Sequence, residues 1–242
     1  MDEPGATGYA SRFLEWAYAS ASPLYDLIVW WGFLPLGGEA ACRREFVRWL
    51  RLQPRLRVAS LCCGTGSMER AMLAEVPSLS ITGVDLGSGQ IARARKKNPE
   101  TGVTYVLGDA ARTQLPAESF DRVLIGLALH EMPRSTRLAV LREARRLCAR
   151  DGHVLAIEHG RPLHRASRFV RGFWWFFWIP GNPEVPTSRD LQEHGLDAEM
   201  RECGLGVIER HTTRPDWIEA LLSTPSGQAA PPPPKLSPPE SR

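Results

Sequence analysis

Residues 58–70, with the sequence VASLCCGTGSMER, join an apolar run to a glycine-containing turn and then to a helix-forming stretch. The run Val58 to Leu61 has the composition of a buried strand. Gly64 and Gly66 permit positive φ angles and let the backbone approach a ligand closely. A helix that begins near Ser67 would present free N–H groups to that ligand. This stretch therefore predicts a strand–turn–helix unit with a binding site at the turn.

Short apolar runs alternate with helical patterns over the next hundred residues. The candidate strands are 57–61, 80–85, 103–107, 120–126 and 152–158. The clearest helix covers 136–150, where apolar residues recur at helical spacing before Asp151-Gly152. Apolar strands that alternate with helices predict an α/β fold, with a Rossmann-like, mostly parallel sheet covered by helices on both faces. Ligands of such sheets bind at the carboxyl ends of the strands, near the point where strand order reverses.

Length and composition favour one domain, since the chain has 242 residues of which 43% are hydrophobic. We expect a helical lead-in and substrate lid over 1–54, a core over 55–223 and a disordered tail over 224–242. The tail contains seven prolines. A net charge of +3, spread along the chain, argues against a nucleic-acid partner. An odd number of cysteines with no C-x-x-C spacing fits a reducing compartment, so we predict a cytoplasmic location. The acidic N-terminal residues do not resemble a signal peptide.

The five cysteines predict neither a disulfide framework nor a zinc site, because their number is odd and no C-x-x-C spacing occurs. Cys62 and Cys63 are expected to be small apolar residues at a packed strand end. A soft-metal or metalloid site there would require a third thiolate from elsewhere in the fold. We therefore predict no metal.

The turn could hold either a dinucleotide phosphate or the amino-acid tail of a nucleoside. The dinucleotide fingerprint requires G-x-G-x-x-G, but Glu69 occupies its third glycine position, where a carboxylate would repel a pyrophosphate and hinder close packing of the helix. Asp85, at the end of the second strand, could accept both hydroxyls of a ribose. Asp109 follows the third strand and could receive an adenine amino group, with Leu107 and Ala110 packing against the ring. Either aspartate alone could be a turn residue or helix cap; together they predict a nucleoside pocket.

Four segments then carry a family resemblance. VASLCCGTG, GVDLGSGQIARARKK, VLGDAARTQLPAESFDRVLIGLALHEMP and LREARRLCARDGHVLAIEHGRP resemble the motifs of class I S-adenosylmethionine-dependent methyltransferases. Their order and spacing, over about residues 20–215, are similar to the UbiE-like branch, which methylates quinones and related small molecules. The resemblance implies a seven-stranded sheet with its last strand antiparallel. It also implies S-adenosyl-L-methionine as cofactor, S-adenosyl-L-homocysteine as product and a small, apolar acceptor.

The resemblance also implies a set of cofactor-binding residues at the strand ends and in the lead-in. They are Tyr25, Ser60, Cys62, Gly64, Thr65, Gly66, Asp85, Leu86, Gly108, Asp109, Ala110, Gly126 and Leu127. Two of them depart from the family's usual D-x-G-C-G-T-G. Ser60 replaces an aspartate that would help to hold the cofactor's ammonium, and Cys62 replaces the first glycine. The cysteine suggests that this position needs no positive φ.

Methyl transfer requires a nucleophile held at about 3–3.5 Å from the methyl group, with a base where the acceptor must lose a proton. Candidates lie after strands four and five: His130, Glu131 and His159. His130 is either the base or a helix cap, and His159 is the weaker catalytic candidate. Glu131, like Glu158, could merely satisfy backbone donors.

The segment RFVRGFWWFFWIPGNPEVP is rich in aromatic residues and lies within an insertion at about 161–186. It could form a lid over an apolar substrate, a membrane-surface contact or a homodimer interface, and we favour the lid. A helix over 187–204 and two final strands, LGVIERHTT and WIEALLS, should follow, although the second could be a short helix. The alternatives to a methyltransferase are a non-catalytic binding module on the same fold and an NAD(P)-dependent oxidoreductase.

Overall fold

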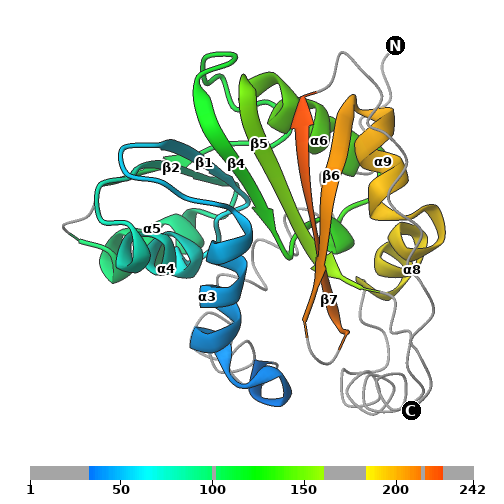
Figure 1. Ribbon diagram of the computed structural model, residues 1–242, viewed down its shortest axis with the longest axis horizontal. Helices are drawn as coiled ribbons and strands as arrows, with labels where there is room; N and C mark the ends of the chain where they lie inside the picture. The colour runs from blue at the N-terminus through cyan, green and yellow to red at the C-terminus, as the bar shows by residue number, and fades with distance from the viewer. Residues whose placement is uncertain (1–32, 100–101, 161–183, 214–215, 226–242) are drawn as a thin grey trace.

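The computed structural model describes residues 33–99, 102–160, 184–213 and 216–225. A single seven-stranded sheet forms its centre, with the strand order β3-β2-β1-β4-β5-β7-β6 (Figure 1). The strands are β1 (Arg57–Leu61), β2 (Ser80–Asp85), β3 (Val103–Leu107), β4 (Phe120–Gly126), β5 (Cys148–His159), β6 (Leu205–Thr212) and β7 (Ile218–Pro225). β7 is antiparallel to both of its neighbours, whereas the pairs among β1 to β5 are parallel. The predicted fold is confirmed.

Helices cover both faces of this sheet (Figure 1). One face carries α3 (Glu39–Trp49), α4 (Ser67–Glu75) and α5 (Ser88–Lys97), and the other carries α6 (Arg134–Leu147), α8 (Glu184–His194) and α9 (Leu196–Glu202). Two short 3-10 helices are η1 (Leu34–Leu36) and η2 (Leu129–Glu131). Successive strand residues alternate between the layers: Val58 packs with α3 and α4, and Ala59 packs with α6.

Element boundaries agree with the sequence for the first four strands and differ afterwards. α6 begins at Arg134 and ends at Leu147, so the predicted helix 136–150 was wrong at its last three residues. Those residues belong to β5, where Cys148 pairs with Phe120 before a register shift. The helix predicted over 187–204 is two helices, α8 and α9, because Gly195 takes a φ of 87° between them. WIEALLS is not a helix: Trp217 lies in a turn and the residues from Ile218 onward form β7.

Several predictions concern residues outside the described ranges. These are Tyr25 with most of the lead-in, the aromatic part of the insertion, and the proline-rich tail from residue 226 onward. The domain boundaries therefore stay predictions. Within the described part of the chain, no helix combines the length and the apolar character required to cross a bilayer.

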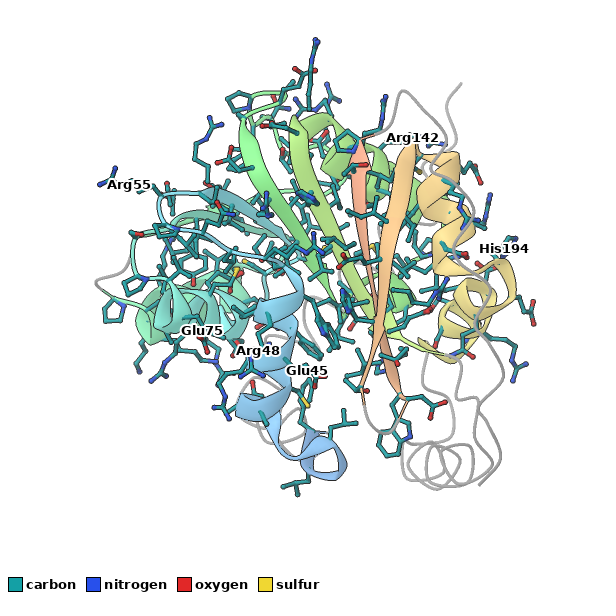
Figure 2. The ribbon with its side chains drawn as sticks, viewed as in Figure 1. Glu45, Arg48, Arg55, Glu75, Arg142 and His194 are labelled. Carbon is teal, nitrogen blue, oxygen red and sulfur yellow. The ribbon has the colours of Figure 1, made fainter. Side chains whose placement is uncertain are left out.

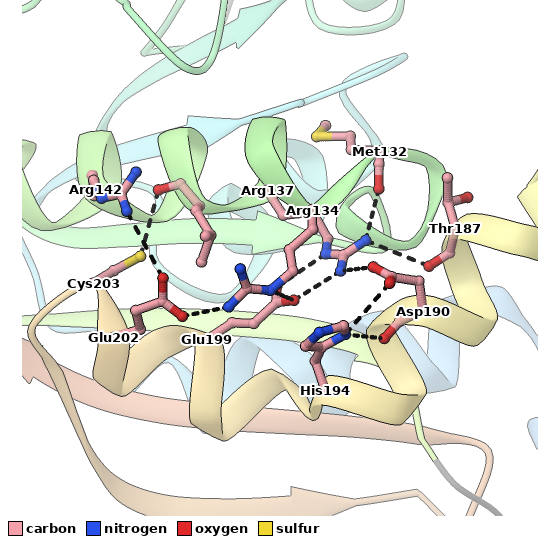
Figure 3. Close-up of polar contacts among 11 residues, drawn as sticks. Met132, Arg134, Arg137, Arg142, Thr187, Asp190, His194, Glu199, Glu202 and Cys203 are labelled. Carbon is pink, nitrogen blue, oxygen red and sulfur yellow. Dashed lines mark hydrogen bonds and ion pairs between the residues drawn. The ribbon is translucent and has the colours of Figure 1, made fainter.

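Arg137 anchors three elements to one another from the middle of α6. Its guanidinium is fully buried and donates to both carboxylate oxygens of Glu199, at 3.0 and 2.7 Å, and to Asp190 at 2.5 Å (Figure 3). Nη1 donates to the carbonyl oxygens of Met132 and Thr187. These bonds fix α8 and α9 to α6 and to the end of η2.

Asp190, Glu199 and the nearby His194 have ligand atoms close enough together to hold a metal ion. Arg137 already provides the positive charge between the two carboxylates (Figure 3). Charged residues elsewhere lie mostly at the surface: Arg48 of α3, Glu75 of α4 and Arg55, just before β1, are exposed (Figure 2). The group around Arg137 is therefore a structural ion-pair network in the second helix layer.

Candidate functional site

The glycine turn after β1 has three residues in the left-handed region. Cys62 has a φ of 57°, Gly64 of 54° and Gly66 of 76°. The prediction that Cys62 needs no positive φ was wrong: the cysteine adopts the conformation that a glycine would adopt more easily. At Gly66, a Cβ atom would lie 2.5 Å from the Tyr105 hydroxyl oxygen and 2.7 Å from the Asn98 side-chain nitrogen, so only glycine fits.

Asn98 and Tyr105 support the turn from beneath. The Asn98 amide nitrogen donates to the Gly66 carbonyl at 3.1 Å and lies 2.8 Å from the Tyr105 hydroxyl. Above the turn, Lys97 Nζ donates to the hydroxyls of Thr65, at 2.9 Å, and Ser67, at 3.0 Å. Both sides of the loop are thereby fixed before any ligand binds, which is the preorganisation that a binding turn requires.

Asp85 connects the tip of β2 to this turn. Its Oδ2 accepts the N–H of Gly64 and its Oδ1 accepts the N–H of Gly87, each at 2.8 Å. Burial raises the pKa of Asp85, while the two N–H groups act in the opposite direction. Asp85 is thus a turn-forming residue in this structure. Each oxygen has a second lone pair with which to accept a ligand hydroxyl.

An apolar surface lies between the tips of β2 and β3. Leu86 is 59% exposed and Leu107 is 55% exposed. The two tips are adjacent, since Asp85 pairs with Leu107 and accepts the N–H of Gly108 through its backbone oxygen. Asp109 follows, exposed, with Oδ1 accepting the N–H of Ala111 at 2.8 Å. Exposed leucines beside a carboxylate can pack against a flat ring that has a polar edge.

There is room at the tips of β1 and β4, the adjacent strands on either side of the order reversal. A Cβ atom added at Gly64 or at Gly126 would have no atom of the described residues within 4 Å. Leu127 follows Gly126 with a φ of 53°, and its N–H donates to Ile157 in β5 at 2.8 Å. The structure therefore brings these predicted residues to the switch point of the sheet.

Four carboxylates, from the ends of β2, β3 and β5 and from η2, lie close enough to Cys62 to affect the pKa of its thiol. Burial raises the pKa of Cys62 well above its ordinary value, and Asp85, Glu131, Glu158 and Asp109 raise it further. We call these four residues the acidic ring. A site with this much negative charge attracts cationic groups and repels phosphates. The uncharged thiol at its centre is a poor metal ligand.

Glu158 and His130 form a buried pair within this ring. Glu158 Oε1 accepts the N–H groups of Ala128, at 2.9 Å, and Leu129, at 2.6 Å, while Oε2 lies 2.8 Å from His130 Nδ1. Burial raises the pKa of Glu158, but the neighbouring His130 and the backbone donors more than offset it, so its pKa is lowered overall. An ionised Glu158 requires His130 to donate from Nδ1. Nε2 is then the basic nitrogen of the neutral ring.

Glu131 and His159 lie beside this pair, and we call His130, Glu131, Glu158 and His159 the His–Glu cluster. The His159 ring meets the His130 ring edge to face, with centroids 4.5 Å apart, and His130 Nε2 lies 3.9 Å from a Glu131 oxygen. His130 is only 8% exposed, whereas His159 is exposed. The three predicted catalytic residues are therefore brought together, and Glu158, which the sequence suggested only as a partner for backbone donors, binds His130 as well.

Comparison with known proteins agrees with this geometry. Residues 58–152 match the family model of a methyltransferase domain. The chain is 29% identical over 152 residues to a demethylmenaquinone methyltransferase of Lactobacillus johnsonii, covering 61% of each chain. It is 31% identical over 162 residues to that of Thermotoga maritima, covering 64% of this chain and 66% of the relative. The resemblance to class I methyltransferases is confirmed.

A solved structure supports the same fold. A SAM-dependent methyltransferase from Aquifex aeolicus superimposes with a TM-score of 0.59 at 14% identity, covering 76% of this chain and 89% of that one. The chain spans less than two thirds of the length of the two curated relatives described above. The matched segment of the methyltransferase domain runs from the second residue of β1 into β5 and includes the glycine turn, Asp85, Asp109 and His130.

Glu69 lies next to the glycine turn, and the sequence did not single it out as a candidate site residue. It lies in the first turn of α4 and is completely buried, close to Ser60 in β1. Its position in the sequence suggested only an obstacle to phosphate binding. Burial of a carboxylate at a helix start cannot be recognised from local sequence, because the first turn of a helix ordinarily favours acidic residues at the surface.

Proposed function

We propose that this chain is an S-adenosylmethionine-dependent methyltransferase that acts on a small, apolar, aromatic or quinone-like acceptor. The observation that supports it best is the acidic ring around Cys62, next to a glycine turn with room above it. A sulfonium with an ammonium tail is attracted to such a site, whereas the pyrophosphate of a nicotinamide dinucleotide is repelled. The names of the two curated relatives favour a quinone-like acceptor.

The cofactor would lie along the strand tips. Asp85 would accept the ribose hydroxyls, and Asp109 would accept the adenine amino group. The adenine ring would pack against Leu86 and Leu107, whose exposure supports this role. The amino-acid tail would lie at the glycine turn, which Asn98 and Lys97 hold in place.

When bound, S-adenosylmethionine supplies an electrophilic methyl group. His130 would accept the acceptor's proton at Nε2 as the nucleophilic atom takes the methyl group. Glu158 holds the opposite ring nitrogen, and Glu131 lies near Nε2, so both carboxylates stabilise the resulting imidazolium. A reduced quinol or a phenol has a hydroxyl proton to lose and can react in this way.

Two measurements test the function together. Titration calorimetry should detect binding of S-adenosylhomocysteine and no binding of NADPH. Transfer of a labelled methyl group should then occur to a member of a panel of reduced quinols, phenols, thiols and amines, with quinols or phenols preferred. Binding of S-adenosylhomocysteine without transfer to any class would favour the non-catalytic module, and binding of NADPH alone would favour an oxidoreductase.

A further inference from the structure

Glu69 is a buried acid for which the described part of the chain provides no matching donor. Its side chain is 0% exposed, and neither carboxylate oxygen has a hydrogen-bond partner among the described residues. An ionised carboxylate that loses its hydration without gaining donors is strongly unfavourable in a protein interior. Such a carboxyl group either binds a proton or pairs with a cationic group of a bound ligand.

The surroundings of Glu69 contain little positive charge. Burial raises the pKa of Glu69, whereas the nearby Ser60 hydroxyl favours the charged form. Asp85 raises the pKa further, and Arg43 of α3 lowers it. Arg43 already donates from Nε to Glu39 at 2.7 Å. A positively charged group of a ligand would therefore be favoured next to Glu69.

The position of Glu69 relative to the turn indicates which cation it could bind. Glu69 lies in the first turn of α4, whose N-cap is Gly66, and Asp85 of β2 accepts the N–H of Gly64. Both carboxylates raise the pKa of the Cys63 thiol, so both lie near this turn residue. Ser60, on β1 beneath the turn, offers a hydroxyl and no charge. The turn is also where the amino-acid tail of the proposed cofactor would lie.

We infer that Glu69 is the counter-ion for the α-ammonium of the cofactor's amino-acid tail, from a helix position next to the uncharged Ser60. The inference rests on the proposed function. An ammonium group would donate hydrogen bonds to the two Glu69 oxygens, and its positive charge would compensate for the burial of the carboxylate. The carboxylate that would pair with the ammonium thus comes from α4 instead of β1.

The test compares two ligands that differ only in this tail. S-adenosylhomocysteine carries the ammonium, whereas 5′-methylthioadenosine has the same nucleoside and a thioether but no amino acid. In Glu69→Gln, titration calorimetry should show at least about a tenfold loss of affinity for S-adenosylhomocysteine and less than about a twofold change for 5′-methylthioadenosine. The amide keeps the size of the side chain and breaks no hydrogen bond within the described residues.

Glu75→Gln is the matched control, because Glu75 lies on the same helix and is exposed (Figure 2). This variant removes the same charge from the surface and should bind both ligands as the wild type does. An unchanged affinity of Glu69→Gln for S-adenosylhomocysteine, or an equal loss for both ligands, overturns the assignment and leaves the proposed function intact. A wild-type protein that binds neither ligand contradicts both proposals.

Discussion

Two non-glycine residues at adjacent strand tips, Cys62 and Leu127, have positive φ angles. Such conformations typically cost about 1–3 kcal/mol each and occur mainly where the surrounding structure enforces them. Here the Cys63 N–H donates to Val84 at 3.0 Å and the Leu127 N–H donates to Ile157 at 2.8 Å, so strand pairing fixes both turns. The strained residues lie next to the open end of the site.

Substitutions at Cys62 should reveal this strain. We expect Cys62→Gly to be neutral or stabilising, because glycine tolerates positive φ, and Cys62→Val to lower the free energy of unfolding by about 1–3 kcal/mol. Urea denaturation measures both. Cys63→Gly is the control: Cys63 does not have a positive φ, so glycine there should destabilise the fold. If the glycine and valine variants at position 62 had equal free energies of unfolding, the conclusion that the backbone of Cys62 is strained would be wrong.

A second prediction concerns His130. We expect His130→Ala to lower kcat for the methyl acceptor by about 10²- to 10⁴-fold, because proton transfer loses its base. The affinity for S-adenosylhomocysteine should change little. His159→Ala is the comparison, since this exposed ring meets the His130 ring edge to face, whereas His130 itself lies 2.8 Å from Glu158 through Nδ1. Rate measurements at saturating cofactor decide the matter: unchanged turnover in His130→Ala would exclude it as the base.

For individual residues, the sequence predicted which ones would lie close together at the strand ends, but not their backbone conformations or their hydrogen-bond partners. Asp85, Asp109 and His130 were recognisable because each follows an apolar strand. The left-handed conformation of Cys62 was not recognisable, since neighbouring strands impose it. The pairing of Glu158 with His130 depends on the contact between β4 and β5, which places residues 28 positions apart within 2.8 Å.

Among the elements, α8 owes its place to Arg137. The helix follows the segment that we expect to be the lid, packs near η2 and accepts two bonds from the Arg137 guanidinium (Figure 3). The same guanidinium binds the carbonyl at the end of η2, the element that contains His130. The buried Arg137 side chain therefore connects α8, the helix that follows the expected lid, to the His–Glu cluster.

Loss of this connection should be costly. We expect Arg137→Met to lower the free energy of unfolding by about 3–5 kcal/mol, because the buried Glu199 loses both hydrogen bonds from Arg137 and keeps only the ion pair with Arg134 at 3.5 Å. The double variant Arg137→Met/Glu199→Met should recover part of the loss. Arg142→Met, on the exposed side of the same helix, should change stability by less than about 0.5 kcal/mol. Urea denaturation measures the free energy of unfolding of all three variants. If Arg137→Met lowered it no more than Arg142→Met does, the structural role of Arg137 would be contradicted.

The strands were more predictable than the helices for a physical reason. Short apolar runs bounded by glycine, proline or aspartate have few other ways to be buried, and β1 to β4 match their predicted bounds. The end of α6 was misplaced because β5 extends to Cys148 by pairing with Phe120, a contact that no local pattern reveals. The break at Gly195 was missed because the helical pattern continues on both sides of it.

In the whole molecule, the reversal of strand order between β1 and β4 brings the predicted site residues together. Three β-strand tips on one side and two on the other meet around Cys62, and parallel pairing of β1 to β5 brings their carboxyl ends to one edge. A homodimer, contact with a membrane surface, the absence of nucleic-acid binding and a cytoplasmic location stay predictions.

Ligand binding should be visible in global stability. S-adenosylhomocysteine at about 100 times its Kd should raise the free energy of unfolding by about 2.7 kcal/mol, because it binds only the folded site. For a chain of this size, this corresponds to a rise in Tm of roughly 5–10 °C. NADPH at equal concentration should leave Tm unchanged. Thermal denaturation followed by circular dichroism measures the shift, and a rise with NADPH alone would contradict the proposed cofactor.

The antiparallel direction of β7 has a practical consequence. Because Ser223 pairs with Val154 and Ile218 with His159, β7 ends beside the beginning of β5, at the edge of the sheet opposite the carboxyl ends of the parallel strands (Figure 1). A fluorophore or surface linker attached at Pro225 would therefore be separated from the acidic ring by the length of the central strands. Immobilisation through that position should present the ligand-binding edge to solution.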